Sequence, residues 1–135
     1  MTVKCFLFQD WVDVSGTATV SSVIQSEPFW LDLAGFRDVI AWLEVRELTN
    51  APSLLYQTAP TKDEPLFSTV TTLSAIGTGV TTTPILQDTA SVPLARWFRW
   101  QASLAGSAWD ISFRIWIAAN APGRANLNRT AATRR

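Results

Sequence analysis

The stretch WDISFRIWIAAN, residues Trp109 to Asn120, decides the fold predicted for this chain. Side chains of a β-strand point alternately to its two sides, so the stretch separates into an apolar set and a mixed set. The apolar set is Trp109, Ile111, Phe113, Ile115 and Ile117, and the mixed set is Asp110, Ser112, Arg114, Trp116 and Ala118. The apolar set predicts a side that faces a core. Trp116 on the other side indicates a surface that something covers, because soluble proteins seldom leave large apolar patches in water.

The same period of two recurs along the rest of the chain. Further strands are predicted at residues 4–14, 17–24, 39–45, 53–58, 77–86 and 94–102. Gly, Pro and Asn positions separate these stretches, and only residues 62–73 have room for a short helical turn. Seven or eight strands at this spacing predict an all-β protein, a single antiparallel β-sandwich of jelly-roll type.

The two ends of the chain differ in charge. Residues 1–119 hold seven Lys and Arg against eleven Asp and Glu, a net charge of −4, and form the predicted sandwich domain. Residues 120–135 have no core pattern and are predicted to form an extended C-terminal arm. Its charged residues are Arg124, Arg129, Arg134 and Arg135, a net charge of +4. We expect the arm to dock on an acidic neighbouring subunit; docking on its own body, the absence of any partner, and contact with nucleic acid are the alternatives.

The composition argues against catalysis. Histidine is absent and there is one cysteine, which removes the usual general base, the Ser-His-Asp triad and the common zinc ligands. Gly77 and Gly79 lack the lysine of a phosphate loop and are interpreted as turn glycines. The TKDEP segment, with Asp63 and Glu64, is the best candidate calcium loop, but a solvated acidic turn is favoured. We therefore expect neither an enzyme nor a bound cofactor or metal.

The N-terminal region carries two further expectations. Cys5 lies in the apolar run CFLF, which predicts a buried, inert thiol. The first twelve residues lack the features of a signal peptide, and no stretch is apolar enough to span a membrane. We expect a protein made in the cytoplasm and left unprocessed, with incorporation into a particle as a further step.

Two stretches resemble the discoidin-like family of jelly-roll domains. FWLDLAGFRDVIAWLEV, residues 29–45, is similar to that family's order of an aromatic residue, an Asp-Leu pair and a core strand. LARWFRWQASLAGSAWDISFRIWI, residues 94–117, resembles its penultimate hairpin. The resemblance implies a jelly roll that binds sugars, lipids or proteins through loops at one end. The family's flanking cysteines are absent here, and no binding residue is carried over.

A hairpin between residues 94–102 and 109–118 would gather tryptophan and arginine on one outer face. Keeping both apolar sets on one side places Trp97 opposite Arg114, with Trp116 on the diagonal. A neighbouring strand at residues 39–45 extends the same surface. The predicted face consists of Trp42, Arg46, Trp97, Arg99, Arg114 and Trp116.

Three kinds of cover suit such a face. Trp and Arg are enriched at the energetic centres of protein interfaces, which favours a subunit interface. Flat indoles also stack on sugar rings, and the loop at 62–73 or the arm could fold over the face within one chain. Single-stranded nucleic acid is disfavoured by the acidic body. The sequence thus predicts a non-catalytic structural subunit of a homo-oligomer or larger assembly, such as a phage decoration or accessory protein; the alternative is a jelly-roll module that binds carbohydrate or another ligand.

Overall fold

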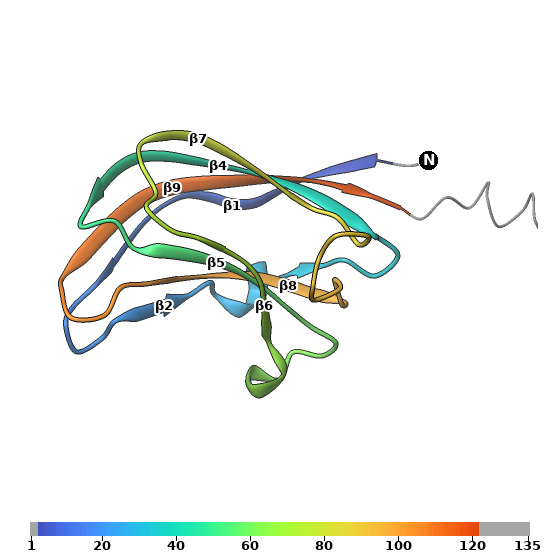
Figure 1. Ribbon diagram of the computed structural model, residues 1–135, viewed down its shortest axis with the longest axis horizontal. Helices are drawn as coiled ribbons and strands as arrows, with labels where there is room; N and C mark the ends of the chain where they lie inside the picture. Colours follow the sequence, from blue (N-terminus) through green and yellow to red (C-terminus); the bar gives the residue numbers. More distant parts are fainter. Residues whose placement is uncertain (1–2, 122–135) are drawn as a thin grey trace, which may run out of the picture.

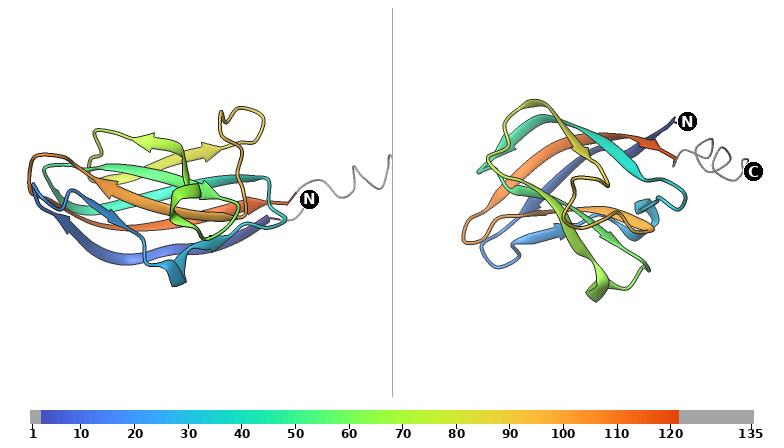
Figure 2. Two further views of the ribbon diagram at one scale, coloured as in Figure 1. Left: turned by 90° about the horizontal axis from the view of Figure 1, so that it is seen from below. Right: turned by 45° about the vertical axis from the view of Figure 1, so that its right-hand side comes forward.

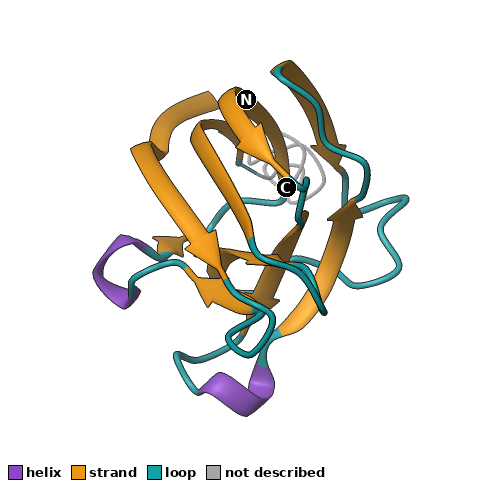
Figure 3. Cartoon of the chain, turned by 90° about the vertical axis from the view of Figure 1, so that its left-hand side faces the viewer, coloured by secondary structure: helices purple, strands orange, loops and turns teal. Residues whose placement is uncertain are grey.

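Residues 3–121 are described by a computed structural model, in which two antiparallel sheets pack face to face (Figure 1). The strands are β1 (Val3–Gly16), β2 (Ser22–Ile24), β3 (Leu31–Asp32), β4 (Asp38–Thr49), β5 (Ser53–Ala59), β6 (Ser68–Leu73), β7 (Gly79–Ile85), β8 (Trp97–Ser103) and β9 (Trp109–Asn120). Short 3₁₀ turns at Glu27–Phe29 and Glu64–Leu66 lie outside the sheets (purple in Figure 3). Each contains a proline, which fits the first turn of a helix but cannot continue one.

The connectivity is that of a jelly roll. The four-stranded sheet has the order β1-β9-β4-β7, and the other sheet has the order β2-β8-β5-β6, with β3 also paired to β8. Because β2 and β3 pair with the same strand, they count as one interrupted strand. The first strand then pairs with the last, the second with the one before the last, and so on inward to β5 and β6. This nested pairing confirms the jelly-roll β-sandwich predicted from the sequence.

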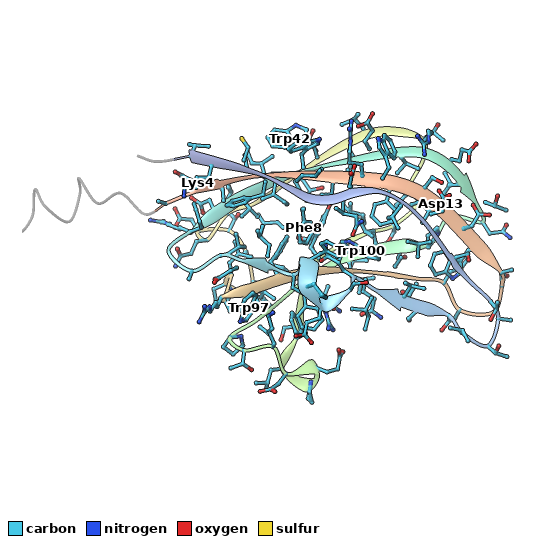
Figure 4. The ribbon with its side chains drawn as sticks, turned by 180° about the vertical axis from the view of Figure 1, so that it is seen from behind. Lys4, Phe8, Asp13, Trp42, Trp97 and Trp100 are labelled. Carbon is cyan, nitrogen blue, oxygen red and sulfur yellow. The ribbon has the colours of Figure 1, made fainter. Side chains whose placement is uncertain are left out.

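The core lies between the sheets and is filled by the inward sides of the strands. The apolar side of β9 is buried as its alternation predicts. Phe8 packs on Phe98 with ring centroids 5.2 Å apart, and Trp100 meets the edge of Phe113 at 4.9 Å. Figure 4 shows Phe8 and Trp100 between the two layers.

Strand β1 forms one edge of the four-stranded sheet and runs along β9 (Figure 2). Its register against β9 shifts between Leu7 and Gln9 and again between Gln9 and Val12. Such bulges bend and twist a strand, which makes an exposed edge a poor template for another chain. On the opposite edge, Pro84 within β7 removes a backbone donor.

The predicted hairpin between residues 94–102 and 109–118 is wrong. Strand β8 pairs with β2, β3 and β5, whereas β9 pairs with β1 and β4 in the other sheet. Residues 104–108 carry the chain across the sandwich instead of turning it back beside itself. Both strands bury an apolar side, but they meet across the core and not within one sheet.

Other expectations also change at the level of single elements. Cys5 is exposed, because it lies on the outer side of β1, so the prediction of a buried thiol is wrong. Strand β6 was not predicted as a strand, and β2 is shorter than the stretch at 17–24. Asn120 belongs to β9, one residue beyond the predicted domain boundary. The rest of the predicted arm, with its four arginines, lies outside the described residues except for Ala121.

Within residues 3–121, no helix has the length and hydropathy needed to cross a membrane.

Candidate functional site

The jelly-roll topology divides the predicted aromatic and arginine face into two surfaces. Strand β8 carries Trp97 and Arg99 on the outer side of the five-stranded sheet. The other predicted face residues lie on β4 and β9, in the four-stranded sheet. Figure 4 shows Trp42 and Trp97 on opposite outer sides of the sandwich. The six predicted residues are therefore not one site.

On the five-stranded sheet, the loop before β6 covers Arg99. The guanidinium donates to both carboxylate oxygens of Glu64, at 2.7 and 2.8 Å, and to Oε1 of Gln57 at 2.8 Å. It also lies over the Phe67 ring, 3.8 Å from the centroid. Arg99 is only 1% exposed as a result. The hydrogen bonds from Arg99 hold the pKa of Glu64 below its ordinary value.

The same loop covers Trp97. Lys62 Nζ lies 4.4 Å from the centroid of the Trp97 ring, and the Arg96 guanidinium lies 5.1 Å from it. Arg96 in turn is held by Asp32, and its hydrogen bonds lower the pKa of that carboxyl group. Of the three covers weighed for the predicted face, the chain's own loop at 62–73 is thus the one observed over Trp97 and Arg99. Within TKDEP, Glu64 thus forms an ion pair with Arg99 and begins the short 3₁₀ turn.

The outer face of the four-stranded sheet presents an apolar surface at one end. Leu7, Trp116 and Trp42 are direct neighbours across β1, β9 and β4. They are 44%, 41% and 37% exposed, respectively. The next row toward the chain ends is Cys5, Ala118 and Ile40. We call these six residues the apolar end of the outer face.

A shallow hollow continues the apolar end toward the edge of the sheet. Its volume is about 240 Å³, and it shares Ile40 and Ala118 with the apolar end. Leu86 and Val3 also line it, and both are exposed. Apolar surface therefore extends from the tryptophan pair to the point where β9 ends.

An aromatic and arginine cluster occupies the middle of the same face. The Arg46 and Arg114 guanidinium groups lie 4.3 and 4.8 Å from the centroid of the Trp11 ring. Arg114 also donates to Glu44 at 2.6 Å. Both predicted arginines are thus engaged, and Trp11 is the partner that the sequence interpretation missed. The alternation of β1 already places Trp11 on the outer side. Its contact with Arg114, however, depends on β9 lying beside β1.

The far end of the face is acidic. Asp13, Glu47 and Asp110 line a hollow of about 340 Å³, together with Val14, Ser15 and Ser112. The Ser112 hydroxyl donates to the Asp13 carboxylate. No basic side chain among residues 3–121 lines this hollow, and none of the acidic groups in that range forms a cluster suited to a metal ion. We call these three carboxylates the acidic end of the outer face.

A further cleft opens between the edges β1 and β2. Its volume is about 340 Å³, and its lining includes Val12, Val23, Phe29 and the edge of Trp100. The Trp100 indole donates to Oε1 of Gln9 at 3.1 Å, which satisfies the indole N–H. The lining is mixed, because Gln9, Asp13, Ser15 and Ser26 also contribute to it.

No protein-family model and no curated protein matches the sequence. The solved structures that are similar in shape include the following two. One is the K1 cleaved adhesin domain of Lys-gingipain from Porphyromonas gingivalis W83, with 11% identity over 91% of this chain and 100% of that chain, and a TM-score of 0.47. The other is from Bacillus endospore appendages that form disulfide-linked pili, with 14% identity over 90% of this chain and 93% of that chain, and a TM-score of 0.37. Neither is described as discoidin-like.

Proposed function

We propose that this chain is a non-catalytic structural subunit that assembles with copies of itself through the outer face of the four-stranded sheet. The row of Leu7, Trp116 and Trp42 carries the proposal, because it exposes three large apolar side chains side by side. Aromatic side chains are enriched at the energetic centres of protein interfaces. Covering the exposed part of each indole, on the order of 100 Å², contributes about 2–3 kcal/mol.

The surroundings of the tryptophans favour a protein partner. Their neighbours Leu7, Ile40 and Ala118 are aliphatic and offer no hydrogen bonds to sugar hydroxyls. The nearest charged side chains of the next row, Glu44 and Arg114, already bind each other. An apolar surface of this kind matches another apolar surface better than it matches a carbohydrate.

We extend the proposal to an accessory or decoration subunit of a phage or other bacterial particle. The absence of histidine, the low content of charged residues and the basic C-terminal segment support it. Subunits of such a particle need a stable scaffold and contact surfaces, and they need no catalytic group.

Light scattering after size-exclusion chromatography tests the self-assembly. We expect the wild type to form a dimer or larger oligomer, and the variant with both Trp42→Ala and Trp116→Ala to be monomeric. Phe29→Ala is the matched control, because Phe29 is 63% exposed and lies outside this face. A wild type that stays monomeric at high micromolar concentration would rule out self-assembly.

The single cysteine provides a second readout. Cys5 lies at the apolar end and is exposed in the isolated chain. Its reaction with a maleimide should be slow in the oligomer and fast in the double tryptophan variant. Equal rates would show that the apolar end is not part of the interface.

Carbohydrate binding is the second candidate function. It is favoured by one observation, the direct opposition of the Trp42 and Trp116 side chains on neighbouring strands. Titration of the monomeric protein with soluble glycans, followed by tryptophan fluorescence, separates the two. Saturable quenching that the tryptophan substitutions abolish would favour the sugar, whereas unchanged fluorescence would favour assembly.

A further inference from the structure

The two ends of the outer face, taken along the strand direction, differ in chemistry. The apolar end lies beside Asn120, where β9 ends, and the acidic end lies beside Asp110, near where β9 begins. Figure 4 shows the corresponding separation on β1, with Lys4 and Asp13 at its two ends. The ten residue steps from Asp110 to Asn120 span roughly 33 Å, at about 3.3 Å per residue. A partner surface must therefore match two different chemistries at two separate places.

The chain itself contains a segment with the complementary charge. Residues 122–135 follow the apolar end and contain four arginines and no acidic residue. Residues 3–121 carry a net charge of −4. The acidic end gathers three of the carboxylates, and the rest of the described chain supplies no basic lining residue to neutralise them. Charge complementarity thus favours a copy of this chain as the partner.

We propose that two copies pack outer face against outer face about a two-fold axis, with their strands running in opposite directions. Residues 122–135 of each copy then lie across the acidic end of the other. This inference rests on the proposed self-assembly, and it adds the orientation of the pair and the occupant of the acidic end. A two-fold interface uses the same surface twice, so each contact occurs in duplicate.

The register follows from the position of the apolar end. This surface spans the rows of Trp116 and Ala118, so its centre lies near Ile117 along β9. A two-fold axis through that centre relates the two copies. A residue a given number of positions before Ile117 in one copy then faces the residue the same number of positions after Ile117 in the other. Asp110 precedes Ile117 by seven residues, and Arg124 follows it by seven. The proposed pair requires the chain to keep the direction and spacing of β9 beyond Asn120, and Arg124 of one copy then lies opposite Asp110 of the other.

The charges disfavour the opposite orientation. Two copies with their strands aligned in the same direction would bring the apolar ends together, but they would also bring the two acidic ends together. Six carboxylates would then face one another, and like charges in juxtaposition weaken association strongly. The reversed arrangement opposes each acidic end with four arginines.

Charge-swap variants test the arrangement. Asp110→Lys and Arg124→Asp each place like charges at both copies of the contact in their own homodimer. We expect each homodimer to dissociate about tenfold more readily than the wild type. An equimolar mixture of the two variants should recover an affinity within about threefold of the wild type, because both contacts in the mixed dimer are then between opposite charges.

The mixture separates contact between copies from contact within one chain. If residues 122–135 bound the acidic end of their own chain, mixing the single variants would restore nothing, and only the doubly substituted chain would recover. Asp88→Lys, mixed with Arg124→Asp, is the matched control, because Asp88 is an exposed acid on the loop after β7. Thermal unfolding of each variant checks that its fold is intact.

The outcomes distinguish this inference from the proposed function. If the dimer depends on Trp42 and Trp116 but its affinity is unchanged by Asp110→Lys and by Arg124→Asp, the reversed arrangement is refuted and self-assembly is still supported. Recovery of affinity in the mixture of Asp88→Lys with Arg124→Asp would also refute the reversed arrangement, since any added positive charge would then compensate for the lost arginine. A wild type that never dimerises would overturn both.

Discussion

Substitution of Glu64 by Gln should loosen the loop that covers the five-stranded sheet. Glu64 accepts two short hydrogen bonds from Arg99, and Arg99 is 1% exposed. The substitution keeps the size of the side chain but removes its negative charge. Arg99 would then be buried against Phe67 with only Gln57 and one neutral amide oxygen as acceptors.

The size of the effect follows from the burial of the two partners. Removal of one member of a fully buried ion pair costs about 3–5 kcal/mol. The side chain of Glu64 is 63% exposed, so water reaches the outer part of the pair and compensates for part of the loss. We expect the free energy of unfolding to fall by about 1–2 kcal/mol, which lowers Tm by roughly 3–8 °C.

Urea denaturation followed by tryptophan fluorescence measures this loss. Asp88→Asn is the matched control, because its partner Arg37 is 41% exposed at the side chain and exposed pairs contribute at most about 0.5–1 kcal/mol. The lowered pKa of Glu64 adds a dependence on pH. Its contribution is present above the ordinary value of 4.5 and is lost as pH falls through the lowered value, so wild type and variant should converge in acid. A loss no larger than that of Asp88→Asn would refute the structural role of the pair.

The remaining predictions concern the interior. Gly16→Ala should lower the free energy of unfolding by about 1–3 kcal/mol, because a Cβ at Gly16 would overlap the buried Trp109 indole. Gly77→Ala, where a Cβ meets open space, should change it by less than about 0.5 kcal/mol, and equal losses would contradict the overlap. Burial raises the pKa of Tyr56 far above its ordinary value of 10.0, and this is the single tyrosine of the chain, so absorbance near 295 nm should show no tyrosinate until the protein unfolds. Tyr56→Phe should be neutral or slightly stabilising by chemical denaturation, because the buried hydroxyl has no hydrogen-bond partner among residues 3–121.

Alternation along single strands could be predicted from the sequence because it is a local property. The apolar side of WDISFRIWIAAN is buried as its chemistry indicates, and on the other side Asp110 and Trp116 are exposed whereas Ser112 is buried. The spacing of strands and turns likewise indicates a jelly roll, and the observed strand order confirms it. Trp42 and Trp116 were both placed on outer sides for the same reason.

Pairing between distant strands could not be predicted in this way. The apolar side of a strand is buried equally well whether the other strand lies beside it in the same sheet or across the core in the other sheet. Burial alone therefore did not show that β8 and β9 lie in different sheets. The cover over Arg99 depends on Glu64, which lies 35 residues earlier. Trp11 contacts Arg114 only because β9 pairs with β1. This pairing is a property of the topology, and the sequence of neither strand alone predicts it.

The position of β9 also has a consequence for synthesis of the protein. This strand is the last one made in the described part of the chain, yet it lies between β1 and β4 in the middle of its sheet. During translation, β1 and β4 leave the ribosome before β9, the strand that lies between them. Their apolar sides therefore stay without this partner until nearly the whole chain has been made. We therefore expect nascent chains that stop before Trp109 to be substrates for chaperones and proteases, and folding of the four-stranded sheet to follow the completion of synthesis.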